Sequence, residues 1–138
     1  MKKKIYFIIF LFYVTNIFAT YSGVPFEILN KGIGVKAISL GEAYVAASKD
    51  ATSIFWNPGF LDEITKNEIY FSYESFFERA HFDFISFIMP AGKYGGVGAS
   101  VSYMSYGKYE EVDSGGNIIG ESSINDIIAS LGYGKSLF

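Results

Sequence analysis

The chain has 138 residues, a formal charge of −3, no cysteine and a single histidine. A mildly acidic chain without a basic stripe is not suited to nucleic acid, which we exclude as a partner. Aromatic residues make up 19% of the sequence and glycine occurs 15 times against three prolines, a composition typical of all-β proteins with tight turns. Because disulfides are absent, a large core, a partner or a membrane must stabilise the fold.

Residues 1–19 have the layout of a secretory signal peptide. Lys2–Lys4 form a positive start, "IYFIIFLFYV" is apolar, and Ile17 and Ala19 occupy the −3 and −1 positions of a cleavage site. The stretch is short for a spanning helix, and an uncleaved anchor is the alternative. Cleavage would remove three lysines and take the charge from −3 to −6, so we leave this stretch out of the fold argument.

Residues 20–66 form a segment rich in small side chains, among them Gly32, Gly34, Ala37, Gly41, Ala43, Ala46 and Ala47. Within it "AISLGEAYVAAS" (37–48) is ambiguous, and we expect irregular or extended structure there. Asp50 can cap a short helix over residues 51–56. That helix must end near Asn57, because a residue before proline avoids the α region. The small residues indicate a compact segment built for close backbone approach.

From residue 67 onward the apolar pattern has a period of two. It predicts four strands joined as an antiparallel meander, over residues 67–75, 81–90, 95–107 and 126–138. Between the last two we expect a long polar connection over 108–125, with a Gly-Gly-Asn turn signal.

The predicted strands have two unlike faces. In the third strand Val97, Ala99, Val101 and Tyr103 alternate with Gly98, Ser100, Ser102 and Met104. An apolar face opposite a small or polar face, with tyrosines near strand ends, is the form of a membrane-barrel strand. The alternation is weaker in the second strand, where both faces carry Phe or Ile. A soluble β domain with a glycine-rich sheet is the alternative.

Four strands are too few for a barrel of one chain, because the smallest have about eight. An open sheet would also expose two edges to hydrocarbon. Either several copies assemble or the sequence is part of a longer one. We expect the second, because the alternation still runs at "GYGKSL" (132–137), and we attribute the terminal Phe138 to chance.

The stretch "GIGVKAISLGEAYVAASKDATSIFWNPGFL" (32–61) resembles the PorV/PorQ group of outer-membrane proteins, which are related to the FadL-type transporters of hydrophobic compounds. Residues 70–107 also resemble the first barrel hairpins of that group. Glu42 and Phe60 depart from its pattern. The matching positions are Gly34, Leu40, Gly41, Ala43, Tyr44, Val45, Ala46, Asp50, Ala51, Thr52, Trp56, Asn57, Pro58, Gly59 and Leu61.

The resemblance implies an all-β, antiparallel transmembrane barrel in the outer membrane, preceded by a hatch inside the lumen. Residues 20–66 would form the hatch and residues 67–138 the first strands. Trp56 would pack the hatch against the inner wall, or be an ordinary anchoring aromatic. Asn57 would cap its own turn or serve transport. The hatch and turn motif comprises Gly41, Tyr44, Asp50, Trp56, Asn57, Pro58 and Gly59.

The sequence offers no catalytic constellation, and we expect no enzyme, cofactor or metal site. The lone His81 excludes a multi-histidine site and belongs in a surface turn. The adjacent acids at 62–63 and 110–111 would point to opposite faces of a strand. "DSGGN" (113–117) is too short for a calcium loop, and "GKYGGVG" (92–98) lacks the helix of a phosphate loop.

Three functions therefore compete. The first is passage of hydrophobic small molecules through a hatch-gated barrel, and the second is a barrel that carries secreted cargo proteins. In both, outer-membrane lipid is a partner. The third is a soluble exported β-domain that binds a partner protein by strand addition at its edges.

Overall fold

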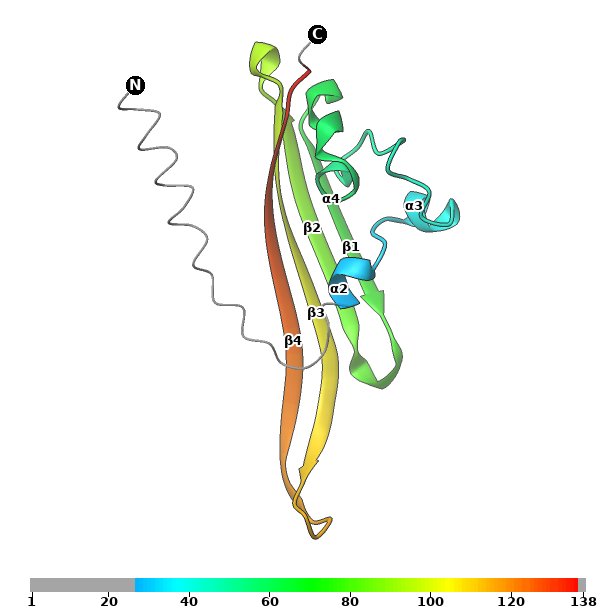
Figure 1. Ribbon diagram of the computed structural model, residues 1–138, viewed down its shortest axis with the longest axis vertical. Helices are drawn as coiled ribbons and strands as arrows, with labels where there is room; N and C mark the ends of the chain where they lie inside the picture. Colours follow the sequence, from blue (N-terminus) through cyan, green and yellow to red (C-terminus); the bar gives the residue numbers. More distant parts are fainter. Residues whose placement is uncertain (1–26, 137–138) are drawn as a thin grey trace, which may run out of the picture.

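The computed structural model describes residues 27–136. Four antiparallel strands form one open sheet in the order β1-β2-β3-β4 (Figure 1). Their bounds are β1 Glu68–Ser75, β2 His81–Pro90, β3 Gly96–Val112 and β4 Ile118–Gly134. Short 3-10 turns, η2 Phe77–Arg79 and η3 Gly92–Tyr94, join β1 to β2 and β2 to β3. The predicted antiparallel meander is confirmed.

The polar connection predicted over 108–125 is wrong. Most of it is strand, because β3 and β4 each run for 17 residues and pair to within a few residues of their shared turn. The Asp113 carboxylate accepts the N–H groups of Gly115 and Asn117 at 2.8 and 2.9 Å, so the turn lies at the predicted Gly-Gly-Asn. Both faces of this projecting hairpin meet solvent, so its sequence does not need the apolar alternation on which the prediction depended.

The two faces of the sheet differ as the period of two predicts. On β2, Phe82, Phe84 and Ile88 are at most 1% exposed, whereas Ile85 and Phe87 are exposed. Both faces of β2 carry large apolar groups because one packs under the N-terminal part of the chain and the other forms the outside of the sheet.

Residues 27–67, the N-terminal segment, lie on the inner face of the sheet (Figure 1). The segment contains α2 Glu27–Asn30, α3 Val35–Ser39, α4 Ser53–Trp56 and the 3-10 helix η1 Pro58–Glu63. Of the irregular or extended structure predicted for 37–48, the extended form is wrong, because α3 covers the start of the stretch. The rest is irregular, with turns that follow to residue 47. The helix predicted over 51–56 is shorter, beginning at Ser53, and it ends before Asn57 as predicted.

The core lies between this segment and the sheet. One cluster of buried residues joins Ile28, Ile33 and Ile54 to Phe82 and Phe84, and a second comprises Ala51, Leu61, Ile64 and Ile88. The predicted signal peptide lies outside the described residues. Among residues 27–136 no helix is long and apolar enough to cross a membrane.

Candidate functional site

The N-terminal segment approaches the sheet where the inner face has no side chains. A Cβ atom at Gly96 would collide with the carbonyl of Leu61, and one at Gly134 would collide with the carbonyl of Pro58. At Gly132 a Cβ would lie 3.1 Å from the Leu61 side chain. The small residues that permit close approach are therefore those of the strands as much as those of the segment.

A direct hydrogen bond fixes the centre of this interface. The Ser86 hydroxyl on β2 donates to the carbonyl oxygen of Ala51 at 2.6 Å, and both residues are buried. A serine on the wall of the sheet thus satisfies a backbone acceptor at the start of α4, which burial would otherwise leave unpaired.

Asp50 organises the turn before α4. Its Oδ1 accepts the backbone N–H and the hydroxyl of Thr52 at 2.9 and 2.6 Å. Its Oδ2 accepts the Tyr44 hydroxyl at 2.8 Å and lies 3.4 Å from the Lys36 ammonium. One carboxylate therefore connects α3, the turns after it and Thr52 at the start of α4. The predicted capping of the helix by Asp50 is wrong, because Thr52 occupies the N-cap position and no side chain caps α4.

The same network shifts two pKa values. Burial raises the pKa of Asp50, but the hydrogen bonds from Thr52, Tyr44 and Lys36 outweigh it and hold the pKa below its usual value of 3.8. Burial, assisted by the hydrogen bond to Asp50 and by its negative charge, raises the pKa of Tyr44 from 10.0 to about 12. The neutral phenol and the ionised carboxylate therefore coexist over the whole neutral range.

Trp56 joins two parts of the N-terminal segment. Its Nε1–H donates to the Ile33 carbonyl at 2.8 Å, and its ring meets those of Phe55 and Tyr44 edge-on at 5.2 and 6.2 Å. Its neighbour Phe55 contacts the sheet, where it packs against the buried Phe84. Trp56 thus acts as an anchor within the segment.

The Asn57-Pro58-Gly59 motif is a self-capped turn. The Asn57 Oδ1 accepts the Gly59 N–H at 3.1 Å, and its Nδ2 donates to the Val45 carbonyl at 3.2 Å. Pro58 begins η1, where a missing N–H costs nothing. The local capping role that we considered for Asn57 is confirmed.

Gly41 and Glu42 both adopt the left-handed conformation, with φ of 62° and 66°. Glycine does so without strain, whereas glutamate does not. Position 42 is where this sequence departs from the glycine of the PorV/PorQ pattern. The Glu42 side chain is exposed and lies over Gly32, where a Cβ would collide with it.

At the other end of the segment an ion pair attaches it to β1. The Lys31 ammonium lies 2.6 Å from the Glu74 carboxylate, and both side chains are mostly shielded from solvent. The ammonium also lies over the rings of Phe76 and Phe82, at 4.8 and 5.6 Å from their centroids. Sequence periodicity did not identify this contact, because the two residues lie 43 positions apart.

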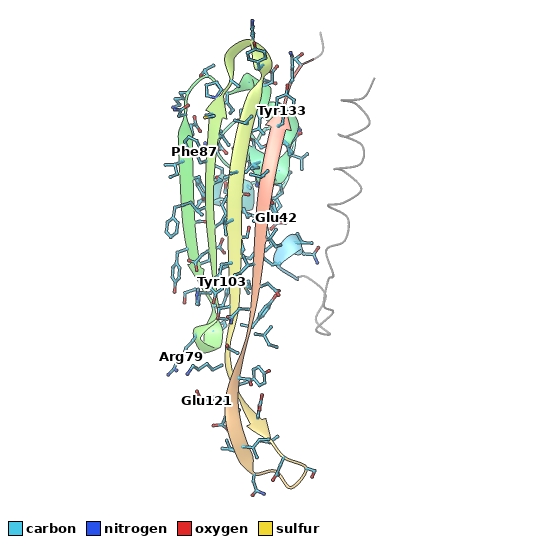
Figure 2. The ribbon with its side chains drawn as sticks, turned by 90° about the vertical axis from the view of Figure 1, so that its left-hand side faces the viewer. Glu42, Arg79, Phe87, Tyr103, Glu121 and Tyr133 are labelled. Carbon is cyan, nitrogen blue, oxygen red and sulfur yellow. The ribbon has the colours of Figure 1, made fainter. Side chains whose placement is uncertain are left out.

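The outer face of the sheet is an apolar band with no covering element among the described residues. The strand register aligns the outward side chains in four rows that cross the sheet from strand to strand. Measured along the strands, the first and last rows are about 20 Å apart at the usual rise per residue. Figure 2 views this face and labels Phe87, Tyr103 and Tyr133. The band comprises Ile69, Phe71, Tyr73, Ile85, Phe87, Met89, Val97, Ala99, Val101, Tyr103, Ile127, Ala129, Leu131 and Tyr133.

One end of the band carries an aromatic and polar cluster. His81 is not in the predicted turn but begins β2, with its ring 5.9 Å from Tyr73 and 5.7 Å from Tyr103. Its Nε2 lies 3.6 Å from the Asp83 carboxylate. Tyr133 lies at the opposite end, where its hydroxyl donates to the Tyr94 carbonyl at 2.8 Å.

A cavity of about 380 Å³ opens beside β1, between that edge strand and the N-terminal segment. Its walls are mainly apolar, and its polar lining includes Tyr44 and Asp50 of the network. The other lining residues are Ile33, Gly34, Val35, Lys36, Ala37, Ala51, Thr52, Glu68, Ile69 and Tyr70.

Several other acidic residues have structural partners. Glu63 pairs with Lys49 at 2.6 Å, and Asp62 accepts the Ser136 N–H at 2.8 Å. Glu110 lies across from Glu121, which binds Lys108 at 2.9 Å. Within residues 27–136 no group of three or more His, Cys, Asp or Glu side chains is placed to hold a metal ion.

Comparison with known proteins gives no family. The chain matches no protein-family model, no curated protein and no solved structure closely enough to support an assignment.

Proposed function

We propose that this protein is an outer-membrane β-barrel protein of the FadL/PorV-like kind, whose sheet forms part of the barrel wall and whose N-terminal segment forms a hatch on the lumen side. It would serve the passage of hydrophobic compounds or the secretion of proteins. The apolar band supports this proposal above all. Leu131 is 91% exposed and Ile69 is 71% exposed, and large apolar surfaces of this kind mark contacts with membranes or partners.

The boundaries of the band favour lipid as the contact. The rows end at tyrosines and His81 on one side and at Tyr133 on the other, and aromatic girdles at both interfaces flank the apolar surface of membrane barrels. The hairpin of β3 and β4 projects beyond the row that contains Tyr73 and Tyr103. It is largely polar, so we expect it to lie in water. The short η3 turn lies at the opposite end, next to η1.

The unpaired edges favour the second candidate, a soluble exported domain that binds a partner protein by strand addition. Among the described residues β1 and β4 each have a neighbour on one side only. Such edges accept an extended segment through main-chain hydrogen bonds. This candidate does not account for the apolar band, which is why we place it second.

Membrane extraction of the expressed full chain tests the proposal. We expect the protein to remain in the membrane pellet after alkaline carbonate and to be released only by detergent. Release by carbonate alone would contradict membrane insertion and favour the soluble domain.

Two matched substitutions locate the contact. Ile69→Lys places a charge within the band and should lower the inserted fraction, since lysine on the lipid face of a barrel costs about 2–4 kcal/mol at mid-membrane. Ile118→Lys alters an equally large and exposed isoleucine on the projecting hairpin, and should insert as the unaltered chain does. Equal insertion of both variants would show that the band does not face lipid.

A further inference from the structure

Most positive side chains of this protein have a carboxylate partner, and those that lack one lie at the ends of the apolar band. Residues 27–136 contain seven lysines and one arginine. Arg79, Lys93 and Lys135 form no ion pair within that part of the chain. The cations that do form one are Lys31, Lys36, Lys49, Lys66 and Lys108.

At the hairpin end of the band, acidic groups balance the unpaired cation. Arg79 lines a pocket together with Glu110 and Glu121, and Figure 2 labels Arg79 and Glu121 at this end. Asp83 points outward from β2 in the same row as Tyr103. Positive and negative charges therefore alternate here, and this end has no preference for an anion.

The opposite end of the band, at η3, carries positive charge without this balance. Lys93 and Lys135 are both exposed there. The acids at this end, Asp62 and Glu63, belong to η1 on the inner face, and each already has a partner. Among the described residues that point outward from the band, Asp83 at the far end is the only acid. The outer surface at η3 is thus locally cationic.

The turn itself fixes the place of both lysines. Gly92 and Gly95 adopt φ of 58° and 96°, and the Ala91 N–H donates to the Gly95 carbonyl at 2.6 Å, which closes the turn. Lys93 lies inside the closed turn. A Cβ atom at Gly95 would lie 3.1 Å from the Cβ of Lys135, so the residue that directly follows β4 lies beside the same turn.

Two exposed tyrosines accompany the lysines. The Lys93 ammonium lies over the Tyr94 ring, 5.1 Å from its centroid, and the Tyr133 hydroxyl donates to the Tyr94 carbonyl at 2.8 Å. Tyr94 is 62% exposed and Tyr133 is 60% exposed. Amphipathic rings of this kind are enriched at the level of lipid headgroups.

We propose that Lys93 and Lys135 bind the phosphate of an anionic phospholipid headgroup at the η3 end of the band. The inference rests on the proposed function, in which acyl chains cover the band and the headgroups lie at its ends. Lysine stems lie along apolar surface while their ammonium groups reach the headgroup. Because membrane barrels have short turns on the periplasmic side, this lipid belongs to the periplasmic leaflet. A zwitterionic lipid fits less well, since its own cation would meet two lysines.

Native mass spectrometry of the full chain in a non-ionic detergent tests the proposal. Phosphatidylglycerol and phosphatidylcholine with identical acyl chains would be supplied in equal amounts, so that only the headgroup differs. We expect the protein to retain mainly phosphatidylglycerol. Lys93→Gln and Lys135→Gln should each lower the ratio of the two bound lipids about fivefold, because one lysine near an anionic surface contributes about that factor.

A matched control removes the same charge elsewhere. Lys36→Gln and Lys108→Gln alter lysines that already have carboxylate partners, and should leave the lipid ratio unchanged. Unchanged fluorescence of the single tryptophan would show that each variant keeps its fold. Equal retention of both lipids by the unaltered chain would overturn the proposal, as would an unchanged ratio when both Lys93 and Lys135 are replaced.

Two further measurements separate the alternatives. Displacement of phosphatidylglycerol by millimolar inorganic phosphate would overturn the lipid assignment and show a site for the free anion. Carbonate extraction of the same variants distinguishes this inference from the proposed function. Protein that stays in the membrane but shows no lipid preference would refute the headgroup site alone. A preference that depends on the two lysines, in protein that carbonate releases, would refute membrane insertion alone.

Discussion

At the scale of single residues, Asp50 organises the turn that precedes α4 and does not cap the helix itself. It accepts hydrogen bonds from Thr52 and Tyr44 and pairs with Lys36. Its charge therefore holds together α3, the turns after α3 and the start of α4. Because the pKa of Asp50 is lower in the folded chain than the usual 3.8, its contribution to stability is fully present above that pH. The contribution is lost as the pH falls through the folded-state value.

We therefore expect Asp50→Asn to lower the free energy of unfolding at neutral pH by about 1 kcal/mol. The partly exposed carboxylate should contribute less than a fully buried charged hydrogen bond would. The variant should also lose less stability than the unaltered chain below pH 3.8. Urea unfolding at several pH values, followed by the fluorescence of the single tryptophan, measures both effects. Glu63→Gln, which removes an exposed ion pair, is the control and should change little. Parallel pH profiles would contradict this role of Asp50.

Glu42 provides a second test at this scale. Its φ of 66° favours glycine, and no hydrogen bond of its side chain offsets the strain among the described contacts. Glu42→Gly should raise the free energy of unfolding by about 1 kcal/mol. Ala43→Gly, next to it but without a positive φ, should lower stability because glycine only adds flexibility there. Destabilisation by both substitutions would show that the side chain of Glu42 matters more than its backbone.

At the scale of elements, η1 and the ends of β3 and β4 form one packed unit. The carbonyl groups of Leu61 and Pro58 occupy the space that side chains would fill at Gly96 and Gly134. The inner face of the sheet is therefore shaped by the backbone of the N-terminal segment. This contact explains why glycine occurs in strands, where it is otherwise unfavourable.

Gly96→Ala should accordingly cost about 1–3 kcal/mol, because the new methyl group must displace backbone. Gly120→Ala on β4 makes the same chemical change where the nearest atom is 3.7 Å away, and should be close to neutral. Thermal unfolding followed by circular dichroism compares the two. Hydrogen exchange over residues 58–64 should rise in the first variant alone, and equal exchange in both would refute close packing at Gly96.

At the scale of the whole molecule, the two faces of the sheet have different roles: the inner face packs against the N-terminal segment and the outer face carries the apolar band. Phe84 is 1% exposed and contacts Phe55 and Tyr70, so it joins the N-terminal segment to the wall. Phe87, three residues away on the same strand, belongs to the outer band and is 42% exposed. One residue type on one strand thus serves both surfaces.

Phe84→Ala should lower the free energy of unfolding by about 3–5 kcal/mol, as truncation of a buried phenylalanine does. Phe87→Ala should stay within about 1 kcal/mol, because Phe87 is exposed on the outer face of the sheet. Urea unfolding in detergent gives both values. A large loss at Phe87 with a small one at Phe84 would mean that the inner and outer faces are assigned the wrong way round.

Much of this architecture was predictable from local patterns. Alternation with a period of two located β1 and β2, and the residue before Pro58 located the end of α4. These signals succeed because each depends on neighbours in the chain. The length of the hairpin of β3 and β4 was not predictable, because hydrogen bonds between the strands maintain it where both faces meet solvent. The start of α3 was missed because small residues fit several conformations.

The sequence by itself determined that the chain forms an antiparallel meander with unlike faces, and that a turn capped by Asn57 precedes the first strand, since these follow from periodicity and steric limits within a few residues. Only the tertiary structure decided which face is covered. The N-terminal segment and the glycines of β3 and β4 lie far apart in sequence and become partners because their shapes fit. The contacts of Lys31 with Glu74 and of Ser86 with Ala51 belong to the same class.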